Sequence, residues 1–362
     1  MTPDALALSV HLGEGDRDGG GRRPLADALM DLLAAREPLA AVLLRGVEGF
    51  GIRHRRRTDR LLSLSEDLPL VATAVDRAER IAPLAAEAAA LVGGGLVTLE
   101  RLTLPDHSLA GGLPPPRTED DEIALTAYCG RGERSGGGPV AWAALMAMRA
   151  AGMTATTILA GLDGVVLGDR RRARFMSRNV GVPAVVRAVG PRAAAARALI
   201  AVRGALPGRH LLTAERVRVV RRGGRAVADL PAPPAADAAG NGVFQRVTVV
   251  AAERGGGRPL HGALLRGLRE HGAAGATVLR GVGGHVGDGP LHADRLLAVR
   301  RRAIVVLTFV DTVPEVARLW PVVARATAST GLVTCESVPA ARAAGPGGPR
   351  GGLALADVRT GG

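Results

Sequence analysis

The sequence predicts an α+β fold in which one βαββαβ unit of about 100 residues occurs three times in tandem. Three observations predict it: a segment that returns without gaps, a closing strand that returns with it, and the same order of apolar periods in each copy. The returning segments are 24–49, 139–164 and 259–284. The first and third share 11 identities and the first and second share eight. The closing strands are 96–100, 211–215 and 332–336.

The first half of each copy is predicted to be a strand, a loop and a helix. In copy 1, apolar residues alternate from Leu6 to Leu12, as in a half-buried strand. A Gly-rich loop, 13–23, leads to Pro24, which a helix tolerates in its first turn. Apolar residues then recur at helical spacing and form one buried stripe: Leu25, Ala28, Leu29, Leu32 and Leu33.

The second half adds two strands, a helix and a last strand. In copy 1 these are strands 41–44, 68–75 and 96–102, with a helix over 78–91 that Asp76 can cap. Copy 3 predicts the same order, with strands 247–250, 277–279, 304–310 and 332–338 and helices 259–271 and 312–328.

This order of elements is that of a ferredoxin-like unit, in which two helices cover one face of a four-stranded antiparallel sheet. Strands such as 303–307 and 182–186 are apolar at nearly consecutive positions, which indicates burial on both faces. Three sheets that face a common axis would bury the second face of each. The sequence therefore predicts three tandem ferredoxin-like units that close into a single-chain pseudo-trimer.

Composition changes divide the chain into repeats and connecting segments. The repeats are expected at 5–104, 123–220 and 244–339, the second being the most divergent. Gly- and Pro-rich stretches predict extended, poorly ordered linkers at 105–122 and 221–243 and a disordered tail at 340–362.

The net charge of +13 is typical of proteins that bind nucleic acid or membrane surfaces. The sequence contains no Lys, however, so Arg supplies all 47 of its basic residues, as in chains from GC-rich genomes. Aromatic residues make up 2%, too few for base-stacking platforms. A basic nucleic-acid-binding protein is therefore the less favoured alternative.

The motifs of common enzyme classes are missing. Without Lys there is no Walker-type phosphate loop and no Schiff-base lysine, and neither G-x-S-x-G nor H-E-x-x-H occurs. The eight His are scattered, and Cys129 and Cys335 belong to no C-x-x-C pair. We therefore expect a non-enzymatic protein with no metal site, no required cofactor and no disulfide. No apolar run reaches the ~18 residues of a membrane span, so a soluble protein is expected. With two distant cysteines and no disulfide framework, a reducing cytoplasm is the expected location.

Several segments together resemble the PII-like family catalogued as domain of unknown function 190. They are Leu12-Gly13-Glu14-Gly15, Arg45 to Gly51, Leu64 to Pro69, Gly95 to Glu100 and Ala276 to His285. The resemblance implies trimeric ferredoxin-like units that bind small anionic effectors, typically adenine nucleotides, between neighbours. It also implies a loop between the second and third strands that engages a partner, such as a membrane transporter or an enzyme.

Carried onto this sequence, the resemblance gives ten candidate ligand-binding residues. They are Gly13, Glu14, Arg45, Gly46, Gly49, Gly51, Glu253, Arg280, Gly281 and Gly284. The glycines would let a nucleotide approach the backbone, and an Arg fork would bind its anionic group. Copy 2 has Ala160 in the Arg position, so the clefts are expected to be unequal, and a degenerate scaffold that has lost ligand binding stays an alternative.

The segments between the second and third strands, 49–66, 165–181 and 285–301, are expected to be mobile effector loops. Their Arg runs, 53–57, 170–172 and 300–302, either form a solvated cationic face or bind phosphate and carboxylate groups. Because three fused copies already close a ring, the chain is expected to be a monomer.

Overall fold

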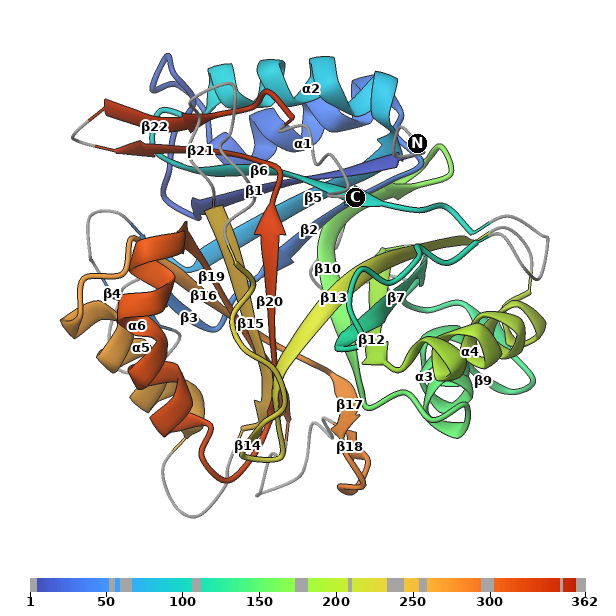
Figure 1. Cartoon of the computed structure of the whole chain (residues 1–362). Helices are drawn as coiled ribbons and strands as arrows, with labels where there is room; N and C mark the ends of the chain where they lie inside the picture. The colour runs from blue at the N-terminus through green and yellow to red at the C-terminus, as the bar shows by residue number, and fades with distance from the viewer. Residues whose placement is uncertain are drawn as a thin grey trace.

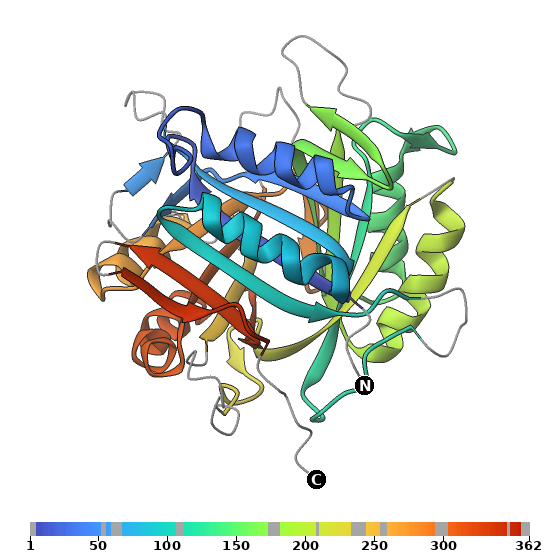
Figure 2. The same ribbon diagram turned by 90° about the horizontal axis from the view of Figure 1, so that it is seen from above.

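The computed structural model is a mixed α/β fold in which strands fill the middle and three helix pairs lie outside them (Figures 1 and 2). Its description covers residues 5–51, 56–58, 67–105, 112–172, 182–207, 210–232, 244–253, 259–293, 303–345 and 348–355. Within these residues there are six helices and a large antiparallel sheet. Each helix pair belongs to one of the three repeats.

Repeat 1 has the predicted order of elements. Its main elements are β1 (Ala5–Gly13), α1 (Leu25–Arg36), β2 (Ala40–Arg45), β5 (Pro69–Arg77), α2 (Ala78–Leu91) and β6 (Gly95–Leu102). Two short strands, β3 (Glu48–Phe50) and β4 (Arg56–Thr58), lie between β2 and β5. The strands pair antiparallel in the order β2-β5-β1-β6.

Repeat 2 has the same strand order, β10-β12-β7-β13. Its main elements are β7 (Asp121–Gly130), α3 (Val140–Ala150), β10 (Ala155–Val166), β12 (Pro183–Gly190), α4 (Arg192–Ala205) and β13 (Leu211–Arg222). Short hairpin strands accompany them: β8 (Arg134–Ser135), β9 (Gly138–Pro139), β11 (Asp169–Arg172) and β14 (Arg225–Ala226).

Repeat 3 repeats the order again, as β16-β19-β15-β20. Its elements are β15 (Phe244–Ala252), α5 (Leu260–Glu270), β16 (Ala276–Arg280), β17 (Gly283–Val286), β18 (His292–Ala293), β19 (Ile304–Thr312), α6 (Val313–Ala326) and β20 (Leu332–Val338). Two further strands follow it, β21 (Ala340–Gly345) and β22 (Gly348–Gly352).

Each repeat has an apolar core between its sheet and its helix pair. In repeat 1, Leu6, Leu8 and Val10 of β1 point to the helices and pack with Leu29 of α1 and Ile81 of α2. The alternate residues of β1 face the middle of the molecule. Both sheet faces are therefore largely buried, as the apolar strands predicted.

The second strands join the three repeats to one another in one register. Val42 pairs with Gly164 at the junction of repeats 1 and 2, Thr157 with Gly284 between repeats 2 and 3, and Thr277 with Gly49 between repeats 3 and 1. These six residues occupy two equivalent positions of the repeated segment. Each repeat therefore pairs with both of the others.

The ends of the fourth strands form a second set of links. Thr103 of repeat 1 bridges to Ala214, β13 extends along β20 of repeat 3, and β21 pairs with β6 of repeat 1. The chain thus returns to its first repeat, as the side-by-side position of β21 and β6 shows (Figures 1 and 2).

The structure differs from the sequence-based expectations for the tail, for the linkers and for one helix cap. Residues 340–345 and 348–352, expected to be disordered, form β21 and β22, because the free edge of β6 offers unpaired backbone groups that β21 satisfies. The linkers are partly ordered as well: Arg192 donates to the carbonyls of Leu113 and Pro114, and β13 and β14 continue past residue 220. Asp76 does not cap α2; its carboxylate accepts the N–H of Arg77 instead.

Candidate functional site: a cleft between repeats 3 and 1

A cleft of about 800 Å³ lies at the junction of repeats 3 and 1, which is within the usual range of small-molecule pockets. Repeat 1 contributes residues 13 and 15–19 at and after the end of β1, Phe50 and Gly51, and the turn 93–95. Repeat 3 contributes residues 274–277 and 308–310, and β21 closes the cleft with residues 343–345. Both repeats are therefore needed to form it.

Small residues keep this cleft open. A Cβ added to Gly51 would have no atom within 4 Å, so the space beside it is empty. The equivalent positions in repeats 2 and 3 carry Val166 and Val286. The turn 93–95 is three consecutive glycines, of which Gly95 has a φ of +142° that a side chain would strain.

The loop after β1 is held by two carboxylates. The N–H of Gly13 donates to Asp16 Oδ2 at 2.6 Å, and the N–H of Gly15 donates to Asp67 Oδ1 at 2.7 Å. The main chain adds a bond from the N–H of Glu14 to the carbonyl of Leu68 at 2.8 Å. The loop therefore has a fixed conformation before any ligand enters.

The charged groups that line the cleft are three carboxylates, Asp16, Asp18 and Asp67, and the Arg17 guanidinium. His11 also lines it, and burial, assisted by the positive charge of Arg246, lowers the pKa of His11 to about 4. His11 is therefore uncharged at neutral pH. An anionic ligand would need Arg17 or an accompanying metal cation to offset the carboxylates.

The sequence-predicted ligand residues fall into three groups. Gly13 and Gly51 line the cleft. Glu14 and Arg45 form an ion pair at 2.8 Å, and Glu253 and Arg280 form the equivalent pair at 2.5 Å. Each of these four side chains is bonded to the other member of its pair, and none of the four is part of the cleft lining.

The third group, Gly46, Gly49, Gly281 and Gly284, lies buried at the junctions between repeats. A Cβ at Gly49 would come within 2.7 Å of the Ala276 carbonyl oxygen of repeat 3, and one at Gly284 within 2.4 Å of the Thr156 carbonyl oxygen of repeat 2. The interpretation that these glycines admit a ligand is wrong. They are glycines because a neighbouring strand approaches their backbone.

The sequence did not single out most of the cleft lining. His11 was unmarked, and residues 308–310 and 343–345 come from distant parts of the chain. Asp67, Gly95 and Ala276 lie in segments that carried the family resemblance but were not among the candidate ligand residues. The Gly-rich loop 13–23 and Gly51 were the signals for this region. The register that brings the other segments beside it could not be seen without the fold.

The segment 165–181, expected to be a mobile loop, is described as far as Arg172, where it forms the β10–β11 hairpin. Arg170 pairs with Asp31 at 2.8 Å and Arg172 with Asp27 at 2.7 Å, both on α1 of repeat 1. These two arginines therefore join two repeats and do not form a free cationic face. The other two Arg runs, 53–57 and 300–302, lie outside the residues with described side chains.

Two kinds of feature are absent from the residues that the structure describes. No group of three or more His, Cys, Asp or Glu side chains in that part of the chain could hold a metal ion. No helix there is both long and apolar enough to cross a membrane. Cys129 and Cys335 are buried thiols without a disulfide.

The model of one protein family, DUF190, described as "Uncharacterized ACR", matches residues 5–104, 122–219 and 244–340. The chain belongs to the DUF190 family. The three matches coincide with the three repeats of the fold, so the protein consists of three tandem DUF190 domains, as the resemblance in the sequence indicated.

A solved structure described as "Crystal structure study of anthrone oxidase-like protein" is similar over 59% of this chain and 92% of that chain, at 12% identity. Its TM-score is 0.17, so this similarity supports no statement about the fold or function of the DUF190 repeats.

Proposed function

We propose that this chain is a non-enzymatic, PII-like regulatory protein: a single-chain pseudo-trimer of ferredoxin-like units that binds a small anionic effector between repeats 3 and 1. The observation that carries the proposal is the cleft of about 800 Å³ at that junction. The effector proposed is an adenine nucleotide. The segments between second and third strands would then signal to a membrane transporter or enzyme in the cytoplasm.

The pseudo-trimer is supported by the common register of the junctions. Val42, Thr157 and Thr277 are equivalent residues, and each pairs with the same position of the neighbouring repeat. Strand order is also the same in all three repeats, which supports a ferredoxin-like unit for each. If the ring is closed within one chain, sedimentation will give a monomer of 37.0 kDa.

The cleft combines two kinds of surface that a nucleotide requires. Leu96, Ala343 and Ala344 are partly exposed and give an apolar surface for a base, and the glycine turn 93–95 leaves main-chain groups without side chains to cover them. Arg17 is the charged donor for a phosphate. Because Asp16, Asp18 and Asp67 oppose a multiply charged anion, we expect tighter binding of nucleotides that carry Mg²⁺.

Calorimetry of the full chain with adenosine, AMP, ADP and ATP, each with and without Mg²⁺, tests this. We expect one nucleotide per chain. Gly51→Val places in this cleft the side chain found at the equivalent positions of repeats 2 and 3, and should weaken binding at least about tenfold. The control is Gly204→Val, at an exposed glycine of α4 with no atom within 4 Å of an added Cβ.

Absence of binding by every nucleotide, or equal binding by the Gly51→Val variant, would overturn the proposal. In the first case the alternative of a scaffold without a ligand is favoured. Binding to duplex or single-stranded nucleic acid that weakens steeply with salt would favour the other alternative, a basic nucleic-acid-binding protein.

A further inference from the structure

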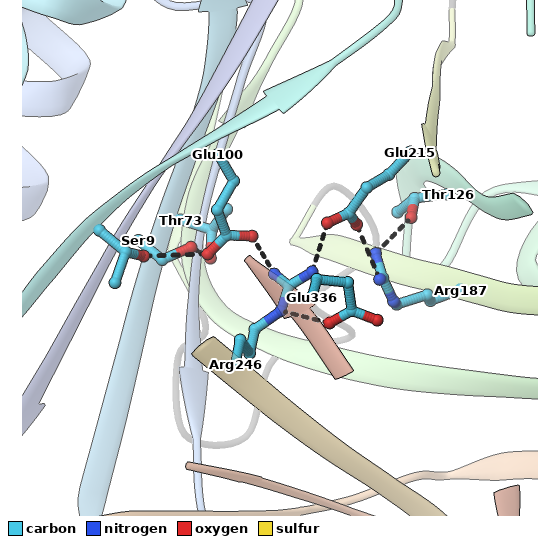
Figure 3. Close-up of polar contacts among 9 residues, drawn as sticks. Ser9, Thr73, Glu100, Thr126, Arg187, Glu215, Arg246 and Glu336 are labelled. Atoms are coloured by element: carbon cyan, nitrogen blue, oxygen red, sulfur yellow. Dashed lines mark hydrogen bonds and ion pairs between the residues drawn. The ribbon is translucent and has the colours of Figure 1, made fainter. Parts of the chain in front are cut away.

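Three equivalent glutamates meet where the three sheets face one another (Figure 3). Glu100, Glu215 and Glu336 occupy the same position of the closing strand in repeats 1, 2 and 3. A single side chain, Arg246 of β15, contacts all three (Figure 3). Its Nη1 pairs with Glu100, its Nη2 with Glu215, and its Nε with Glu336 at 3.3 Å.

These groups are largely removed from water. The Arg246 side chain is 13% exposed, and those of Glu100 and Glu336 are each 9% exposed. Thr98 donates to Glu100 at 2.9 Å, and Arg187 donates to Glu215 at 2.8 Å. The arrangement is therefore a built site, with hydrogen bonds that orient the carboxylates around the guanidinium.

The arginine breaks the threefold equivalence. Glu336 lies opposite Arg246 in the strand register, whereas Glu100 lies opposite Ala7 and Glu215 opposite Ala124. Three identical subunits would supply either three arginines or none at this point. The fused chain can place one guanidinium among three carboxylates, which a trimer of identical subunits cannot.

We propose that Glu100, Glu215 and Glu336 form an axial cation site whose resident ligand is the tethered guanidinium of Arg246. The class of ligand is a planar cation with donors on several edges, which matches carboxylates around it. One carboxylate oxygen of this site could accept a further hydrogen bond from a ligand. Glu336 Oε1 is buried and has no hydrogen-bond partner among the described residues.

The charges in this region show why the cation is needed. The cluster contains three carboxylates and two guanidiniums, those of Arg246 and Arg187. Burial raises the pKa of Glu336, which Arg246 partly offsets. Removing Arg246 alone would leave three carboxylates close together with little water, which is strongly unfavourable.

The first experiment is chemical rescue of Arg246→Ala. We expect its melting temperature to fall by roughly 5 °C or more, the scale for breaking a buried charge pair in a chain of this size. Guanidinium chloride at a few millimolar should recover at least half of that loss, and NaCl at equal concentration should not. The control, Arg36→Ala, removes an exposed pair with Glu87 and should show neither the loss nor the rescue.

The second experiment moves the cation between repeats. If the site is threefold, Ala7→Arg or Ala124→Arg added to Arg246→Ala should restore the melting temperature, because each new side chain starts opposite an equivalent glutamate. Ala7→Arg in the wild-type chain should instead lower it, since two guanidiniums would share one site. The two double variants, Ala7→Arg with Arg246→Ala and Ala124→Arg with Arg246→Ala, also test the proposal if Arg246→Ala alone does not fold.

The proposal would be overturned if Arg246→Ala were as stable as the wild-type chain. It would also be overturned if the melting temperature of Arg246→Ala were restored neither by guanidinium chloride nor by adding Ala7→Arg or Ala124→Arg. Neither experiment depends on ligand binding in the cleft between repeats 3 and 1.

Discussion

The junction of repeats 3 and 1 and the junction of repeats 1 and 2 are paired through equivalent strand positions, but one encloses a cleft and the other an apolar core. At the junction of repeats 1 and 2, eleven buried apolar residues form a common core that includes Val42, Tyr128 and Leu159. At the junction of repeats 3 and 1, the corresponding cluster has four: Phe244, Val310, Val338 and Ala341. The junction of repeats 3 and 1 therefore contains the cleft where the junction of repeats 1 and 2 contains an apolar core.

Two pairs of equivalent residues account for much of this difference. His11 and Tyr128 both lie opposite the first residue of the closing strand, Leu96 or Leu211. The tyrosine is 6% exposed and fills its junction, and burial raises the pKa of its phenol to about 12. Gly51 and Val166 form the second pair. In a fused chain each junction can change independently, so one can close while another stays open.

The largest difference in stability is expected between valine substitutions of two glycines, one at each of these junctions. A Cβ at Gly164 would lie 2.3 Å from the Ala41 carbonyl oxygen of repeat 1, whereas one at Gly51 would meet nothing within 4 Å. Gly164→Val should therefore lower the free energy of unfolding by about 3 kcal/mol or more, and Gly51→Val should change it little. Urea denaturation measures both. Similar losses would mean that the open cleft is not a stable feature.

The sequence predicted the features that depend on neighbouring residues better than those that depend on contacts between residues far apart in the chain. Helix α2 occupies the predicted residues 78–91 and β20 the predicted 332–338, because apolar period and punctuation are local signals. The resemblance to DUF190 was also carried by short motifs. Gly13 and Gly51 of the cleft lining were predicted, but most of the lining was not, since Ala343 to Gly345 reach it only by pairing of β21 with β6.

The glycine interpretation failed for a related reason. Gly49 and Gly284 resemble ligand-contact glycines in sequence, and only the register shows that a strand carbonyl of another repeat occupies the space beside them. Arg246 was unmarked because a single Arg in a basic chain is no signal. Its role depends on three glutamates, which the alignment of repeats had placed at equivalent positions but not in contact.

The second prediction concerns the pH dependence of stability. The pKa of His11 falls from 6.5 to about 4 in the folded protein, so the folded state binds this proton less readily than the unfolded state. The contribution of the uncharged His11 to the free energy of unfolding should be fully present above pH 6.5. It should decrease as the pH falls toward 4, by up to about 3 kcal/mol. His11→Tyr, which copies repeat 2, should remove that loss. Urea denaturation at pH 7.5 and 4.5 would contradict this if both proteins lost equal stability.

A smaller effect is expected from the two equivalent Arg–Glu pairs. In the Arg280–Glu253 pair the side chains are 24% and 10% exposed, against 44% and 34% for Arg45 and Glu14. Arg280→Ala leaves a nearly buried carboxylate without its cation and should cost about 2 kcal/mol. Arg45→Ala should cost about 0.5 kcal/mol, because water replaces the lost partner. Equal costs would show that burial does not distinguish the pairs.

The smallest effects are expected in the hairpin that joins repeat 2 to α1. Arg170 contacts Asp31 and also Asp163, whose side chain is 4% exposed, whereas Arg172 contacts Asp27 with side chains 60% and 34% exposed. Arg170→Ala should therefore cost about 1 kcal/mol and Arg172→Ala no more than about 0.5 kcal/mol. Neither should alter nucleotide binding, because the cleft lies at the other junction. If Arg172→Ala weakened nucleotide binding, the two junctions would be energetically coupled, and the cleft could not be treated as a site of repeats 3 and 1 alone.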